Sequence, residues 1–352
     1  MAFKRLDPED FIVSSDSVTS TVWSNNSPSL NTYFTSSTQK EGTSGPYYLS
    51  VYQTASNSIS AAVQFQIAYA NKNGGGGVNF DSSVPFVSPT TTIYGQYRTL
   101  VLEDENAAFT WGPTYTGSAD NDFYVISIER ARYKQSLLPG SLNLILSSSN
   151  AAYDDIKLTD DSNMVALPTY YGTMRAYQLI SGSDGSSWDG GTGYTALSGS
   201  YGLVLPDIST ILLNSAALSG SGAGSGGINI DTTLTADTFG DNPTKLYNAL
   251  TGSAQFTPAV NVFELNSQET LTSDYVFIRA RNSEYNYTEN PSFISGSTGE
   301  VVFPYFINNP QTYPTTVGLY NDSNDLLAVA KLSRPIQKDF TKEALIRVKL
   351  DF

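Results

Sequence analysis

Alternating apolar and polar positions recur along much of the chain and predict β-strands. The clearest run is at the C-terminal end, where apolar Ile346, Val348, Leu350 and Phe352 alternate with Arg347, Lys349 and Asp351. A period of two places successive side chains on opposite faces, so this run predicts a strand with one buried face and one face in water. Similar patterns predict strands at 48–53, 63–69, 124–128, 142–146, 261–263, 275–279 and 301–303.

Helical patterns are scarce. The most helix-compatible segment is Pro206–Leu218, in which Ile208, Ile211, Leu212 and Leu218 share a face of a helix. Thr244–Leu250 is a second, shorter helical prediction.

Residues 1–60 are expected to form an irregular arm, because turn formers such as Asp7-Pro8 separate isolated apolar anchors. The anchors are Trp23, Leu30, Tyr33 and Phe34. Such an arm cannot build a core of its own. It either crosses the surface of this protein or docks on a neighbour, and the sequence leaves both possibilities open.

These patterns predict a mainly β fold of antiparallel β-sandwich domains, with long loops, an irregular N-terminal arm and a few short helices. We expect four parts. They are the arm 1–60, a sandwich part 61–146, a loop-rich insertion or second domain 147–260, and a C-terminal β part 261–352 that completes the sandwich.

The sequence is most ordered near the C-terminus, where the run 315–320 and the apolar run 326–330 flank the polar segment 321–325. Gly318, Leu319, Tyr320, Asn321 and Asp322 form the centre of this stretch. A glycine inside a strand indicates either a close approach of other atoms or a positive φ.

The amino-acid composition excludes several classes of catalytic and metal-binding site. The chain has 352 residues, a net charge of −14, and neither His nor Cys. An acidic chain without a basic stripe disfavours nucleic-acid binding. Without His and Cys, imidazole catalysis, thiolate chemistry, disulfides and the usual zinc sites are excluded, so we expect no cofactor and no metal. We find no secretory signal or long apolar run and expect a soluble protein, made in the cytoplasm, that does not bind membranes.

Three carboxylate clusters are the strongest candidates for catalysis, namely Glu103–Glu105, Asp154–Asp155 and Asp160–Asp161. A glycoside hydrolase needs two carboxylates across the sugar, but no pair here is singled out by spacing. We interpret the clusters as turns at strand ends and expect no enzymatic activity.

An aromatic segment precedes this C-terminal stretch and contains Tyr285, Tyr287 and Phe293 among Asn and Ser residues. Tyrosines in such a context suit protein interfaces. Packing of the same rings into the adjoining core is an equally good interpretation. Arg347 and Lys349 are further interface candidates, against the alternative that both are only solvated.

The sequence Thr316-Val317-Gly318-Leu319-Tyr320-Asn321-Asp322, followed by 325–331, resembles a hairpin found near tail-fibre attachment regions of contractile-tailed bacteriophages. Arg334-Pro335-Ile336, Glu343 and the closing strand resemble the C-terminal end of baseplate wedge subunits of T4-like phages. The segments 2–10 and 93–97 are similar to virion structural proteins of T4-like cyanophages.

This resemblance implies a virion structural protein that assembles and does not catalyse. The expected location is the tail, with the baseplate wedge favoured, and the expected partners are other tail and baseplate proteins and a second copy of the chain as a homodimer. The alternatives are a tail-fibre or collar attachment protein, a receptor-binding or carbohydrate-binding protein, and, least favoured, a carboxylate-based glycan depolymerase.

Overall fold

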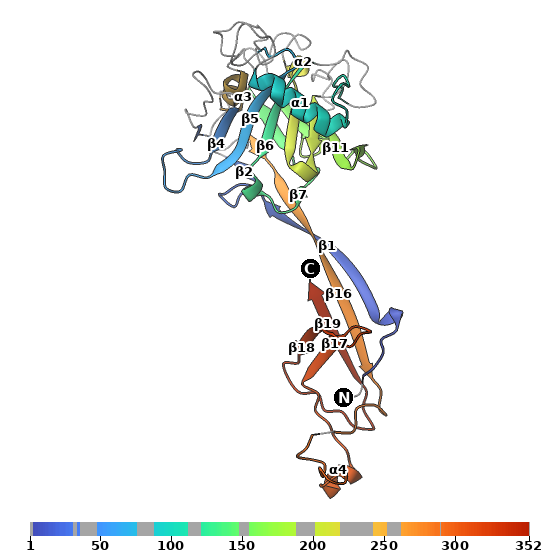
Figure 1. Cartoon of the computed structure of the whole chain (residues 1–352). Coiled ribbons are helices and arrows are strands. Elements are labelled where there is room, and N and C mark those ends of the chain that lie inside the picture. The colour runs from blue at the N-terminus through green and yellow to red at the C-terminus, as the bar shows by residue number, and fades with distance from the viewer. Residues whose placement is uncertain are drawn as a thin grey trace. The chain divides into compact units, whose positions relative to one another are not determined.

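The computed structural model describes residues 3–30, 34–35, 48–75, 88–111, 121–147, 155–187, 201–218, 242–251, 262–288 and 290–351. The backbone of these residues is mainly strand, arranged in large sheets whose registered strand pairs are antiparallel (Figure 1). The predicted mainly β fold with short helices is therefore confirmed.

The chain divides into two compact units. We call residues 18–269 the large unit and residues 1–17 together with 270–352 the small unit. The chain passes from one unit to the other inside the strands β1 (Phe11–Thr21) and β16 (Asn266–Ala280), which pair with each other. The boundaries thus fall at 17 and 269, and the expected boundaries were 60, 146 and 260. Part of the arm expected to be irregular is the regular strand β1.

The large unit is built on one sheet that contains 13 strands in the described part of the chain. The order along its main path is β2-β15-β8-β9-β11-β13-β14-β6-β5-β4-β3, and β10 and β12 pair with β11. The strands are β2 (Ser29–Leu30), β3 (Phe34–Thr35), β4 (Tyr48–Tyr52), β5 (Val63–Asn71), β6 (Asp122–Ile128), β8 (Asn143–Leu146), β9 (Ile156–Asp160), β10 (Thr169–Tyr171), β11 (Met174–Ser183), β12 (Ser186–Ser187), β13 (Gly202–Leu205), β14 (Thr210–Asn214) and β15 (Phe263–Glu264). A short strand, β7 (Ser136–Leu137), pairs with β16 instead.

One face of this sheet packs against α1 (Pro89–Leu102), which contacts β5 (Figure 1). The helix begins at the N-cap Ser88, whose side chain accepts a hydrogen bond from the Thr90 amide, and it ends at Glu103, which has a left-handed φ of 55°. Its buried Tyr94 joins a cluster with Phe109, Trp111 and Phe123. This helix was not predicted from the sequence.

The other face encloses the larger core. Phe65 of β5 and Phe263 of β15 lie far apart in the strand order, yet their ring centroids are 5.2 Å apart. The sheet therefore curls so that its ends face each other across the core. Trp23 packs on both rings, and its indole nitrogen donates to the Pro28 carbonyl at 2.9 Å. The helix α3 (Asn242–Thr251) packs against β4, β5 and β8, and the short helix α2 (Ser215–Leu218) against β6 and β14.

The two helix predictions had different outcomes. Thr244–Leu250 lies within α3, so that prediction is confirmed. Pro206–Leu218 was expected to be one helix, but it is the 3₁₀ turn η3 (Pro206–Ile208), then β14, then α2. All five residues of β14 are buried between β13 and β6. A strand buried on both faces is apolar throughout and loses the alternation that distinguishes it from a helix.

The small unit contains the sheet β1-β16-β19 and a separate two-stranded hairpin. The third strand of the sheet is β19 (Ala344–Asp351), and the hairpin consists of β17 (Thr316–Tyr320) and β18 (Leu326–Lys331). The small unit also contains the short helix α4 (Pro304–Asn308) and the 3₁₀ turn η1 (Pro8–Asp10). The 3₁₀ turn η2 (Arg130–Arg132) belongs to the large unit.

Replacing two glycines of the large unit by alanine should change the free energy of unfolding in opposite directions. A Cβ on Gly202, whose φ is 152°, would lie 1.9 Å from the Leu212 carbonyl oxygen of β14. We therefore expect Gly202→Ala to lower the free energy of unfolding by on the order of 3 kcal/mol. A Cβ on Gly95 in α1 meets open space, so Gly95→Ala should raise it by about 0.5–1 kcal/mol. Urea titrations followed by circular dichroism measure both, and equal stabilities of the two variants would contradict the close approach of β13 and β14.

Candidate interaction surface

The small unit exposes more apolar side chains than it buries. Among the described residues it holds six of the 48 buried hydrophobic residues and 16 of the 23 exposed large ones. The large unit shows the reverse, with 42 buried and seven exposed. A large exposed apolar surface usually marks a place where another molecule binds.

The core of the small unit is one thin layer. Val276 of β16 lies opposite Val348 of β19, and Ile278 lies opposite Ile346. Of these, Val276, Ile346 and Val348 are buried, and partly buried residues such as Leu319 of the hairpin pack on them. Arg347, Lys349 and Asp351 are exposed on the opposite face, which confirms the alternation predicted for this strand.

A groove with a volume of about 1330 Å³ lies in the small unit. Its walls come from residues 3–6, from the inner faces of β16 and β19, and from the hairpin β17-β18. Six of its lining residues are large, apolar and exposed, namely Phe3, Phe11, Tyr320, Leu326, Leu327 and Val329. The groove is therefore an apolar surface open to solvent.

The predicted hairpin motif forms one wall of this groove. Gly318 is not in the left-handed region, so the positive-φ alternative is wrong, but a Cβ there would lie 2.8 Å from the Tyr320 ring. The same ring makes an edge contact with Phe3, with 5.2 Å between the centroids. In the turn, Asn321 accepts a hydrogen bond from the Asp325 amide at 2.7 Å. Leu319 faces the thin core, and Asp322 is exposed.

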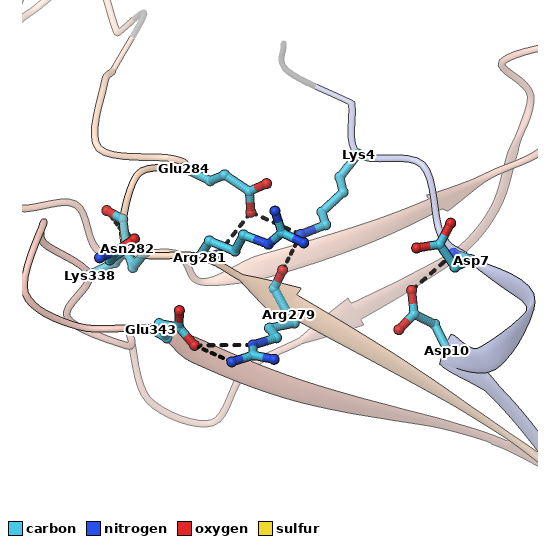
Figure 2. Close-up of polar contacts among 9 residues, drawn as sticks. All are labelled: Lys4, Asp7, Asp10, Arg279, Arg281, Asn282, Glu284, Lys338 and Glu343. Atoms are coloured by element: carbon cyan, nitrogen blue, oxygen red, sulfur yellow. Dashed lines mark hydrogen bonds and ion pairs between the residues drawn. The ribbon is translucent and has the colours of Figure 1, made fainter.

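Polar contacts hold residues 3–6 against the loop that follows β16 (Figure 2). Lys4 donates to the Arg279 carbonyl and to the Glu284 carboxylate, the latter at 2.9 Å. The hydrogen bond from Lys4 lowers the pKa of Glu284. Arg279 donates to Glu343 at 2.7 Å and so links β16 to the start of β19.

Lys338 is a fully buried cation that binds neutral oxygens (Figure 2). Its ammonium group donates to the Asn282 carbonyl at 3.0 Å, to Asn286 Oδ1 at 2.9 Å and to the Asp339 carbonyl at 3.0 Å. All three of its donors are thus satisfied. Lys338 fastens the loop after β16 to the segment before β19.

The three aromatic residues expected either to pack in the core or to form an interface do not all lie in the same environment. Phe293 is half-buried and packs edge-on against Phe303 and Phe306, at 5.3 and 5.6 Å. Tyr285 is half-buried, and its carbonyl accepts a hydrogen bond from Thr312 at 2.6 Å. Tyr287 is exposed and is the member of the trio most accessible to a partner.

Arg347 and Lys349 lie over the ring of Tyr275, 5.5 and 6.0 Å from its centroid. Lys349 also forms an ion pair with Asp351 at 2.8 Å, and the hydrogen bond from Lys349 lowers the pKa of Asp351. Both cations are therefore engaged within their own sheet. Their role in an interface stays a prediction.

Of the three interface candidates of the arm, Trp23 is the one whose side chain the structure describes. Trp23 is buried in the core of the large unit, which corrects the expectation that it could dock on a neighbour. Tyr33 lies outside the described residues. Phe34 belongs to β3, and its side chain is outside the described part.

Sequence reasoning missed the exposed residues Phe3, Leu327 and Val329. A usable signal was present in β18, where five successive residues, 326–330, are apolar. Such a run can be a strand buried on both faces or a strand whose second face awaits a partner. The sequence alone does not separate these two cases.

The carboxylate clusters within the described residues have structural roles. Asp160 is buried and accepts hydrogen bonds from the Gly140 and Ser162 amides at 2.9 and 3.1 Å. Asp161 accepts from the Gln178 amide at 3.0 Å, and burial raises its pKa. Across the described residues, no group of three or more Asp or Glu is arranged to hold a metal ion. None of the helices in that part of the chain is long and apolar enough to cross a membrane.

Comparisons with protein-family models, curated proteins and solved structures give no match for this chain. The resemblance to T4-like phage proteins thus stays a prediction from the sequence.

Replacing Lys338 tests the polar fastening of the small unit. Lys338→Met removes the three hydrogen bonds of the ammonium group and leaves the buried Asn286 Oδ1 without its donor, so we expect the free energy of unfolding to fall by about 2–3 kcal/mol. Lys342→Met is the control, because Lys342 is exposed and makes only a 3.6 Å ion pair with Asp339. Urea titration measures both variants. A Lys338→Met protein as stable as the control would show that these hydrogen bonds contribute nothing.

Replacing Gly318 tests the wall of the groove. The side chain in Gly318→Val must push the Tyr320 ring away from its place beside Phe3. We therefore expect the free energy of unfolding to fall by about 1–3 kcal/mol and the melting temperature to fall with it. Gly296→Val is the control, because a Cβ at Gly296 meets open space. If the two variants melt at the same temperature, the packing of Tyr320 over Gly318 is contradicted.

Proposed function

We propose that this chain is a non-enzymatic structural component of a contractile phage tail, and that its small unit attaches it to neighbouring subunits. The observation that carries the proposal is the unequal burial of apolar residues. This body of 100 residues has, among those that the structure describes, six buried and 16 large exposed hydrophobic residues, a balance that suits completion by contacts with other chains.

The energetics support attachment through this unit. Fully burying one exposed Leu, Val or Phe side chain stabilises an assembly by about 1.5–3 kcal/mol. A few such residues, well packed, are enough to dominate the affinity of an interface. The small unit carries many more than a few, on α4, on the hairpin and on β1.

The assignment to a phage tail depends on the resemblance of the hairpin motif, and that motif lies in the wall of the groove. The baseplate wedge is the favoured location. Attachment of a tail fibre or collar uses the same surface and is the alternative within this proposal.

Exposed residues of α4 provide the test. In an infection in which the chain is supplied as the variant Tyr305→Ser with Ile307→Ser, we expect incorporation into purified particles to fall about tenfold. Both side chains are exposed, at 62% and 63%, so the melting temperature should change little. Quantitative mass spectrometry of the particles measures the incorporation.

The matched control is Met164→Ser with Leu167→Ser, two exposed residues of the large unit. We expect this variant to be incorporated normally. Equal incorporation of both variants would contradict attachment through the small unit, and absence of the unmodified chain from the particles would contradict the structural role itself.

A further inference from the structure

The strand β18 has an open edge. In the described part of the chain it pairs only with β17, and the two strands form a sheet of their own. An unpaired edge presents a row of backbone donors and acceptors to any strand that can reach it.

Most of this edge lacks the usual protection against pairing, since Lys331 at its end is the one charged residue of β18. Natural edge strands carry charges, prolines or inward-pointing polar residues that discourage another strand. The five residues 326–330 contain none of these, and Leu326, Leu327 and Val329 are exposed. The edge is therefore suited to a partner strand, and the exposed side chains are suited to an apolar partner.

The flanking charges favour one partner. Asp325 precedes the apolar run and Lys331 ends it, and both are exposed. In an antiparallel pair of two β18 strands centred on Ala328, Asp325 of each copy lies beside Lys331 of the other. Leu327 then lies opposite Val329, and Ala328 faces its own equivalent. Opposite charges and apolar pairs placed across two strands stabilise their pairing.

The exposed apolar side chains of the hairpin supply part of the surface that a dimer needs. Four of them, Tyr320, Leu326, Leu327 and Val329, each present roughly 100 Å² of apolar surface, or about 400 Å² together. A stable interface buries roughly 800 Å² on each partner, so the backbone and the polar residues of the paired strands contribute a comparable area.

We propose that two copies of this chain associate through β18, which pairs antiparallel with β18 of the second copy about Ala328 and forms one continuous four-stranded sheet. Such an interface is self-complementary and closes as a symmetric dimer. The inference rests on the proposed function only in that both use the apolar surface of the small unit. Dimerisation is measured on the purified chain, whereas attachment to the tail is measured in particles, so one can fail without the other.

The test reverses one charge at a time. We expect the unmodified chain to sediment as a dimer, and Lys331→Asp and Asp325→Lys to raise the dimer dissociation constant about tenfold each, because like charges then meet at both ends. An equimolar mixture of the two variants should recover the original affinity. In the mixed dimer one chain carries aspartate at positions 325 and 331 and the other carries lysine at both, so opposite charges meet again at each end. Analytical ultracentrifugation over a range of concentrations measures all four samples.

Two more variants complete the design. Val329→Lys places a charge on the outward face of β18 and should give a folded monomer whose far-UV circular dichroism matches that of the unmodified chain. This variant keeps the test decisive if Asp325→Lys disturbs the turn, because Asp325 also accepts a hydrogen bond from Asn321 at 3.0 Å. Lys72→Asp, at an exposed lysine of the large unit, is the matched control and should remain a dimer.

Three results would overturn the proposal. The first is an unmodified chain that is monomeric at every concentration or that forms trimers or larger rings. The second is a dimer that Val329→Lys leaves intact, which would place the contact elsewhere. The third is a mixture of the two charge variants that associates no better than either variant alone.

Discussion

Burial of apolar side chains is the constraint on which the rest of this structure depends. In the large unit the curled sheet is covered on one face by α1 and closes around Trp23, Phe65 and Phe263 on the other. The small unit has a single layer of buried residues between one sheet and one hairpin. Polar links such as the Lys338 ammonium group therefore carry a larger share of its stability, and many of its large apolar side chains stay exposed.

The sequence predicted those parts of the fold in which one face of a strand is in water. The alternation of Ile346 and Val348 with Arg347 and Lys349 is found in β19 because that strand has a single covered face. The strand β14 escaped prediction because it is covered on both faces. The helix α1 escaped as well, since Thr90, Thr92 and Ile93 are β-branched residues that favour strands, and burial together with the Ser88 cap overrides that preference.

The candidate surface was predicted only in part. The hairpin was expected from the resemblance of its Gly318 motif to a known hairpin, and it is a local element, because its turn and both strands lie within 16 residues, 316–331. The contacts that complete the groove are not local, since Lys4 meets Glu284 and Phe3 meets Tyr320 across almost the whole chain. Whether an apolar residue is buried in the core or exposed to solvent depends on such contacts between residues far apart in the sequence. Trp23 was a candidate for an interface and is buried, whereas Leu327 was not a candidate and is exposed.

The passage of the chain through β1 and β16 also sets an order of events during synthesis. Residues 1–17 emerge first, but β16 and β19, with which they form the small unit, follow only after all of 18–269 has been made. At typical translation rates this delay lasts roughly 10–50 s. Throughout that interval Phe11, Ile12 and Val13 of β1 have no strand to pair with, because their partner β16 has not been made. The strands of the small unit are therefore the last in the chain that can come together.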